Sequence, residues 1–178
     1  TNFDEERESY FPNNKTYSMP DSVYHLVDPD KDDDISRAYD KIMLDRVKSN
    51  MADYGYTRIT DPSSTNLPNV VVRIAITSST NYGAVWGGYP GYGWGWGWGW
   101  YYPWYPSATY YSYETGTVIV DMADTDDWDP AGGEDQIINA LWQGAINGLL
   151  QNSTSGTSSR IKTGIDQMFT QSPYLNVN

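Results

Sequence analysis

The feature that most restricts how this chain can fold is a long uncharged segment in its middle. No charged residue occurs from Ile74 to Tyr113, and residues 82–113 contain nine Tyr, six Trp and three Pro. Residues 93–100 read GWGWGWGW. Because Gly weakens a helix interior and Pro breaks it, this segment cannot form a regular helix. We therefore expect a low-complexity Trp/Tyr/Gly insert over residues 82–108.

Before the insert, the chain has one helical pattern and two strand-like patterns. Apolar residues recur at spacings of three and four along residues 35–53, which predicts an amphipathic helix capped by Asp33 or Asp34. The alternating stretch KTYSM predicts a strand near residues 14–19. VVVRIAIT is rich in β-branched residues and is too short for a normal helix, so it predicts a largely buried strand over residues 70–78.

After the insert, two further strands and a last helix are expected. Alternation in TVIVDMAD predicts a strand over residues 108–123. Residues 137–150 are ambiguous, because ALWQGAINGLL fits helical spacing but also fits a strand with a bulge at Gly144. Periodicity alone favours the helix there. Apolar spacing then predicts an amphipathic helix over residues 160–170, ending before Pro173.

The composition argues against several classes of function. The chain has 178 residues, which predicts a single domain over residues 1–178. Its 11 Lys and Arg against 23 Asp and Glu give a net charge of −12, so it lacks the cationic face that a nucleic-acid binder needs. The same charge disfavours electrostatic docking on anionic lipid. The absence of Cys excludes disulfides and thiolate metal sites, and no stretch has the about 20 apolar residues of a membrane helix.

No motif in the sequence indicates catalysis. A Ser-His-acid triad would have to use His25, the one histidine, which is better explained as an ordinary, partly exposed side chain. We see no Gly-rich phosphate loop. We therefore expect no catalytic residue and no cofactor, and we expect the chain not to be an enzyme. The alternative is a hydrolase that uses two of the many carboxylates, since general acid–base catalysis needs only two.

Two acidic segments resemble calcium sites in part. DPDKDDD at residues 28–34 spaces its aspartates like the start of a calcium loop, but the turn Gly and the final Glu of such a loop are missing. DTDDWDPAGGED at residues 124–135 could hold calcium weakly through Asp124, Asp126, Asp127 and Asp129. Charged, solvated turns explain both segments better. We expect no metal site.

Several short motifs follow one another in an order that resembles a known family. They are NFDEE and NNKTY, DYGY before NVVVRIAI, the aromatic insert, GTVIVDMAD, ALWQGAINGLL and RIKTGIDQMFTQSP. Over nearly the whole chain, this order resembles the bacterial lipoprotein family known as domain of unknown function family 4136. The resemblance implies that residues 137–150 are a strand, paired with GTVIVDMAD as a hairpin. The linker between them is longer here than the tight turn usual in the family.

The resemblance also implies a fold and a location, but no activity. It implies a lipid-modified Cys near the N-terminus, which this chain does not contain, and hence an outer-membrane-anchored lipoprotein facing the periplasm or the cell surface. We expect an α+β fold with a single mixed, mostly antiparallel sheet and two helices on one face. The aromatic Gly-rich insert would lie between two central strands of that sheet.

The tryptophan run is the strongest functional lead. If GWGWGWGW is extended, its Trp side chains share one face, spaced about 6.6–6.8 Å apart. A purely structural alternative is that this stripe covers the open face of the sheet, since so much apolar surface is rarely left in water. The candidate binding residues are Trp94, Trp96, Trp98, Trp100, Tyr101, Tyr102, Trp104 and Tyr105.

Three binding functions remain open for this run. Trp and Tyr rings can stack on sugar rings, rest in the headgroup region of a bilayer, or form a protein contact such as a homodimer. We expect a non-catalytic envelope lipoprotein domain with a binding or scaffolding role. The alternatives are a glycan-binding module that uses the Trp/Tyr loop and a carboxylate-dependent hydrolase acting on envelope polymers.

Overall fold

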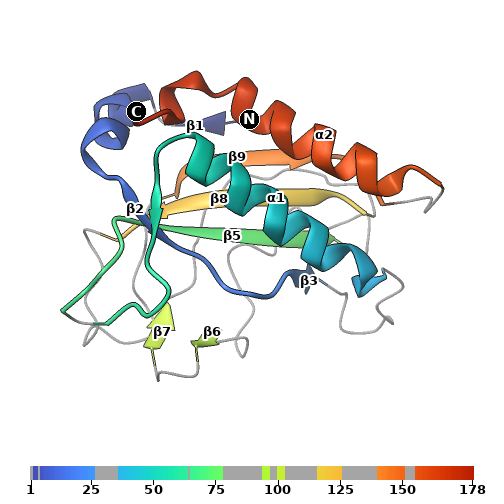
Figure 1. The fold of residues 1–178 in the computed structure, drawn as a ribbon, viewed down its shortest axis with the longest axis horizontal. Coiled ribbons are helices and arrows are strands. Elements are labelled where there is room, and N and C mark those ends of the chain that lie inside the picture. The colour runs from blue at the N-terminus through green and yellow to red at the C-terminus, as the bar shows by residue number, and fades with distance from the viewer. Residues whose placement is uncertain are drawn as a thin grey trace.

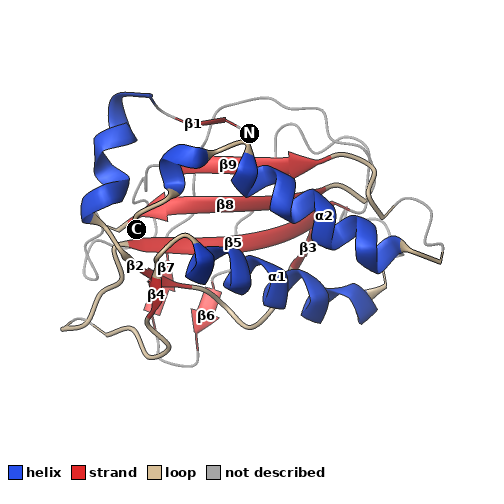
Figure 2. Ribbon diagram, turned by 45° about the horizontal axis from the view of Figure 1, so that its top comes forward, coloured by secondary structure: helices blue, strands red, loops and turns tan. Residues whose placement is uncertain are grey.

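Two helices lie across one face of a mixed β-sheet, as Figure 1 and Figure 2 show. The computed structural model describes residues 2–3, 5–26, 36–63, 65–77, 94–96, 100–102, 116–125, 140–150 and 155–178. Among these residues, no helix is both long and apolar enough to cross a membrane.

The described elements have the following bounds. The strands are β1 (Asn2–Phe3), β2 (Thr16–Ser18), β3 (Tyr24–Leu26), β4 (Thr57–Arg58), β5 (Val70–Thr77), β6 (Trp94–Trp96), β7 (Trp100–Tyr102), β8 (Val118–Asp124) and β9 (Ala140–Ile146). The helices are α1 (Asp40–Asp53) and α2 (Thr157–Thr170), with 3₁₀ helices η1 (Glu5–Asn13), η2 (Arg37–Tyr39) and η4 (Pro173–Leu175).

The main sheet has seven strands, in the order β1-β9-β8-β5-β2-β4, with β3 paired to β5. The long strands β5, β8 and β9 are antiparallel to one another, and β1 is antiparallel to β9. The short strands β2 and β3 run parallel to β5, and β4 runs parallel to β2. The predicted α+β architecture is therefore confirmed, and within the main sheet antiparallel pairing is confined to the long strands and β1.

The core lies between the helices and the sheet, because each element turns an apolar stripe to the same interior. Apolar residues three or four apart on α1 and α2 meet alternate residues of the strands. Burial of each such side chain contributes about 1.5–3 kcal/mol. The fully buried members include Met43, Val47, Met51, Val72, Ile74, Val118, Val120, Ile161, Ile165 and Phe169.

The first helix begins later than its apolar pattern predicts. The pattern extends from residue 35, but α1 starts at Asp40, after the 3₁₀ turn η2. Ser36 provides the cap of that turn, since its Oγ accepts a hydrogen bond from the backbone N–H of Ala38 at 3.3 Å. The predicted caps Asp33 and Asp34 lie outside the described residues.

The second helix and the strand β8 also differ from their predicted bounds. Helix α2 starts at Thr157 rather than residue 160, because Thr157 is itself buried and follows the left-handed Gly156. Strand β8 starts at Val118 rather than residue 108. Gly116 has a φ of 77°, which the extended backbone of a strand cannot adopt, so the strand cannot run back through it.

The ambiguous segment forms the strand β9, as the family resemblance implies and against its helical periodicity. Met122 pairs with Trp142 whereas Ala123 pairs with Ala140, so Leu141 is an extra residue in β9. The bulge is therefore at Leu141 rather than at Gly144. Because Leu141 and Trp142 are consecutive and both buried, the strand does not alternate and its sequence imitates a helix.

The start of the chain contains structure that its polar composition does not predict. Helix η1 follows the short strand β1, and its Phe11 is fully buried in the core. The predicted strand near residues 14–19 is present but shorter, as β2. The predicted strand over 70–78 is present as β5, whose described part ends at Thr77.

Candidate functional site

Part of the predicted aromatic site lies on a hairpin that is not hydrogen-bonded to the main sheet. Strands β6 and β7 pair antiparallel, with Trp94 opposite Tyr102, Gly95 opposite Tyr101, and Trp96 opposite Trp100. Figure 1 draws this hairpin below β5, on the side away from β1, and in Figure 2 β7 overlaps β2 and β4. The remaining predicted site residues, Trp98, Trp104 and Tyr105, lie outside the described residues.

The register of the hairpin gathers its aromatic residues. Residues opposite each other in an antiparallel pair share a face, and so do residues two apart on one strand. These rules place Trp94, Trp96, Trp100 and Tyr102 on one face, which we call the aromatic face. Tyr101 and Gly95 are on the other face.

The hairpin differs from the single extended stripe expected for GWGWGWGW. Because Trp96 pairs with Trp100, the chain reverses direction between these two residues. Residues directly opposite in such a pair have Cβ atoms about 4.5–5.5 Å apart, closer than the spacing along one strand. The register therefore gives two directly opposite pairs on this face, Trp94 with Tyr102 and Trp96 with Trp100, across two strands.

A second feature, absent from the sequence predictions, is a buried ion pair on the sheet face opposite the helices. Arg73 on β5 pairs directly with Asp121 on β8, and its Nε and Nη2 donate hydrogen bonds of 3.0 and 2.8 Å to the two carboxylate oxygens. The two side chains are only 16% and 6% exposed. Such a two-pronged arrangement fixes the relative position of two central strands.

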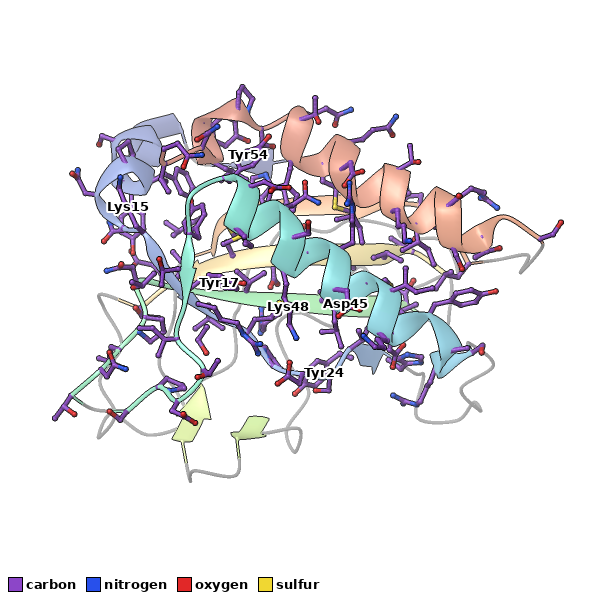
Figure 3. All side chains as sticks on the ribbon, in the orientation of Figure 1. Lys15, Tyr17, Tyr24, Asp45, Lys48 and Tyr54 are labelled. Carbon is purple, nitrogen blue, oxygen red and sulfur yellow. The ribbon has the colours of Figure 1, made fainter. Side chains whose placement is uncertain are left out.

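Tyr24 on β3 lies near this ion pair, at the sheet edge beneath α1 (Figure 3). Burial raises the pKa of Tyr24, and the charge of Arg73 opposes part of that rise. Tyr24 is therefore a neutral phenol at physiological pH. The signal that could have revealed the pair is a single charge in the middle of each of two apolar runs, VVVRIAIT and TVIVDMAD.

Comparison with known proteins places the chain in a family. The sequence model of a domain of unknown function, DUF4136, matches residues 1–174. The chain belongs to this family. A crystal structure of a DUF4136 family protein from Bacteroides thetaiotaomicron is similar at 24% identity and a TM-score of 0.72, over 99% of this chain and 96% of that chain. At 24% identity, this structural similarity shows that the two chains share a fold, and it shows nothing about their function. Among curated proteins, none matches.

The carboxylates described in this DUF4136 chain are largely held by partners that stabilise the fold. Asp166 on α2 accepts hydrogen bonds from Arg46 and from Asn50, both on α1. Asp21 lies within 3.0 Å of Arg58 and also bonds Lys48. Partners of this kind position helices and turns.

Of the predicted calcium segment, residues 124–135, only Asp124 and Thr125 are described. Asp124 ends β8, where it is buried and accepts a 2.8 Å hydrogen bond from the hydroxyl of Tyr10. Asp126, Asp127 and Asp129 lie outside the described residues. Within the described parts of the chain, no group of three or more His, Cys, Asp and Glu side chains could hold a metal ion.

His25 is more buried than its sequence context predicts. Its side chain is 1% exposed, and its Nε2 lies 3.0 Å from a carboxylate oxygen of Asp40, the first residue of α1. The contact links β3 to the start of α1. The expectation of an ordinary, partly exposed histidine is therefore wrong, because the helix start closes over the end of β3.

Proposed function

We propose that this chain is a non-catalytic binding domain of the bacterial cell envelope, and that its binding element is the aromatic face of the hairpin. The observation that supports this best is the register of β6 and β7, which puts three Trp and one Tyr on one face. Trp and Tyr combine a large apolar area with a polar tip and lose little conformational entropy on binding. Four such residues on two short strands form a patch suited to a flat ligand.

Envelope glycans are the ligand class that this chemistry favours. The flat faces of aromatic rings stack on the weakly apolar C–H faces of sugar rings, while indole N–H and phenol O–H groups can bond hydroxyls. Residues 74–113 contain no charge, so they would not discriminate against neutral polysaccharide. Anionic lipid is a less favourable ligand, because the net charge of −12 would repel it.

The arrangement of the fold supports a ligand away from the membrane. Strand β1 lies at one edge of the sheet, and Figure 1 draws the hairpin below β5, on the side away from β1. The lipid attachment that the family resemblance implies would precede β1. A domain held from that edge would direct the hairpin away from its own bilayer, toward the cell wall or the surface.

Binding to insoluble cell-wall glycan tests this proposal. We would compare the parent with a variant carrying Trp94→Ala, Trp96→Ala, Trp100→Ala and Tyr102→Ala in sedimentation with purified peptidoglycan and with cellulose-like polysaccharides. The matched control is Tyr101→Ala, which removes an aromatic ring from the opposite face of the same strand. Loss of the patch should weaken binding at least about tenfold, equivalent to about 1.4 kcal/mol, whereas the control should bind like the parent.

Three outcomes would contradict the proposal. Equal weakening in Tyr101→Ala would show that the register of the hairpin does not define the site. Binding of the parent to liposomes but to no polysaccharide would replace glycan by membrane as the ligand. Release of soluble sugar from the polysaccharide by the parent would show catalysis, which the carboxylate-dependent hydrolase alternative requires.

A further inference from the structure

Two basic side chains from different elements converge on one carboxylate oxygen. Lys48 on α1 and Arg58 on β4 both donate hydrogen bonds to Oδ1 of Asp21, Arg58 through its Nη2 at 3.0 Å. Lys48 and Arg58 are 27% and 23% exposed, whereas Asp21 is 73% exposed. The hydrogen bond from Lys48, together with the bond and charge of Arg58, holds the pKa of Asp21 below 3.8, although partial burial opposes this. The two cations therefore stabilise negative charge at this point.

The fold holds Arg58 in place without help from Asp21. Tyr17 is its direct partner on β2, and the backbone N–H of Ile59 donates to the carbonyl of Tyr17 at 2.7 Å. The Nη2 of Arg58 also donates to the carbonyl of Met19 at 2.8 Å. A cation that is already positioned loses little conformational entropy when it binds a further group. A ligand at this point would therefore require little rearrangement of Arg58.

One donor of this guanidinium has no acceptor. The Nε of Arg58 is buried and makes no hydrogen bond within the described part of the chain. Arg46 and Arg73 differ, because each donates through Nε and Nη2 to both oxygens of one carboxylate. Asp21 accepts from Arg58 through Nη2 alone. Because a buried, charged donor without a partner is unfavourable, Arg58 has the capacity for one more acceptor oxygen.

A phosphate group matches these donors better than the carboxylate of Asp21 does. A phosphate monoester carries about −1.5 to −2 charge near neutral pH and has three strong acceptor oxygens. Separate oxygens can therefore accept from Lys48, from Nη2 of Arg58 and from its Nε. Such a group also balances two cations, whereas Asp21 balances one. Arginine forks and lysine point charges are both common donors to phosphate in proteins.

We propose that Lys48 and Arg58 form a binding site for a phosphate group, and that Asp21 occupies this site while no ligand is bound. Asp21 lies in the connection between β2 and β3, so its exposed side chain can turn into solvent without disturbing the core. The phosphate is either a free ion or part of a larger molecule such as a sugar phosphate, and both present the same group. The site uses no residue of the aromatic face and does not depend on glycan binding.

Titration of the intact, isotope-labelled chain with inorganic phosphate tests the site, with NaCl keeping the ionic strength constant near neutral pH. In nuclear magnetic resonance spectra, the proton signal of the Arg58 Nε–H should move downfield, because this donor gains an acceptor. The shift should saturate with a Kd of about 1 mM, as expected for a small ion held by two partly exposed cations. A sugar phosphate and the corresponding free sugar form the second arm of the experiment.

Opposite charge changes at the site should move the phosphate affinity in opposite directions. Asp21→Asn should strengthen binding at least about fivefold, because it removes the competing negative charge. Lys48→Gln and Arg58→Gln should each weaken binding at least about tenfold, because each removes a charged donor. The matched controls are Asp53→Asn on α1 and Lys162→Gln on α2, which change the net charge equally at exposed positions. Both controls should bind phosphate like the parent.

A phosphate affinity of Asp21→Asn no higher than that of Asp53→Asn would overturn the proposal. So would a shift of the Arg58 Nε–H signal that does not saturate, or equal weakening in Lys162→Gln and Lys48→Gln. If Arg58→Gln does not fold, the Asp21→Asn and Lys48→Gln variants still decide the test.

The second arm distinguishes the source of the phosphate. Tighter binding of the sugar phosphate than of inorganic phosphate, with no binding of the free sugar, would support the site and identify a phosphorylated sugar as the ligand class. Equal affinities would support the site with the free ion as its ligand. Failure of glycan binding at the aromatic face would leave all of these results unchanged, so the two proposals fail separately.

Discussion

Single charged residues inside apolar strands have the clearest consequences at the residue scale. Arg73 and Asp121 each lie within a β-branched run, and strand pairing brings them into one two-pronged contact. A buried pair is costly to desolvate, so its net contribution to stability is small while both partners are present. Removal of one partner lowers stability strongly, because the other charge stays buried without a counter-charge.

Asp121→Asn should therefore lower the free energy of unfolding by about 3 kcal/mol. The double variant Arg73→Met with Asp121→Leu should recover most of that loss, because it leaves no buried charge. Urea unfolding of the parent, Arg73→Met, Asp121→Leu and the double variant gives the coupling energy. Additive effects of the single variants would show that the two residues do not act as a pair.

At the element scale, α1 and α2 are joined by polar contacts as well as by the core. Asp166 on α2 accepts hydrogen bonds from Arg46 and Asn50 on α1. Burial raises the pKa of Asp166, but these hydrogen bonds and the charge of Arg46 lower it by more, so the pKa lies below its usual 3.8. The contact therefore favours the ionised carboxylate.

A depressed pKa fixes the pH dependence of this contact. Its stabilisation should be complete above the unfolded pKa, near 3.8, and should be lost as pH falls through the lower folded pKa. Asp166→Asn should cost about 1 kcal/mol at pH 7, a modest figure because the carboxylate is partly exposed, and almost nothing near pH 2. Urea unfolding at several pH values measures this.

A control comes from the exposed Lys41–Asp45 pair on α1, at 2.6 Å. Asp45→Asn should change stability by less than about 0.5 kcal/mol, because both side chains are well solvated. A pH-independent cost of Asp166→Asn would show that the substitution acts through packing rather than through charge.

For the whole molecule, the excess of acid sets the response to salt. A net charge of −12 opposes the compact state through self-repulsion, and salt screens charges more than a Debye length apart. A rise from about 10 to about 150 mM NaCl shortens that length from about 30 to about 8 Å. Long-range repulsion is then screened more than short ion pairs are.

We therefore expect this change in NaCl to raise Tm by about 2–4 °C, which corresponds to about 1 kcal/mol for a chain of this size. KCl should act equally, as thermal unfolding followed by circular dichroism would show. A separate rise with micromolar CaCl₂ at constant ionic strength would contradict the expectation of no metal site. It would indicate that the acidic segment after β8 binds calcium.

The candidate site and the fold are encoded by different features of the sequence. Repetition of Trp and Gly marked residues 93–100 without any knowledge of structure. The aromatic face depends on the pairing of Trp96 with Trp100, which repetition does not encode, because the Gly and Trp residues inside the run have the same neighbours. The Arg73–Asp121 pair has the same character, since its partners are 48 residues apart.

Local pattern determined the elements that repeat one period without interruption: the apolar stripes of α1 and α2 and the β-branched runs of β5 and β8. The local pattern gave a wrong helix or a wrong helix start where tertiary contacts interrupt the spacing of apolar residues. The bulge at Leu141 gave the sequence of β9 the apolar spacing of a helix. The cap at Ser36 starts a 3₁₀ turn, so that α1 begins only at Asp40. Burial, strand register and ion pairing couple residues far apart in the chain, so only the tertiary structure decided which aromatic residues share a face and which charges meet.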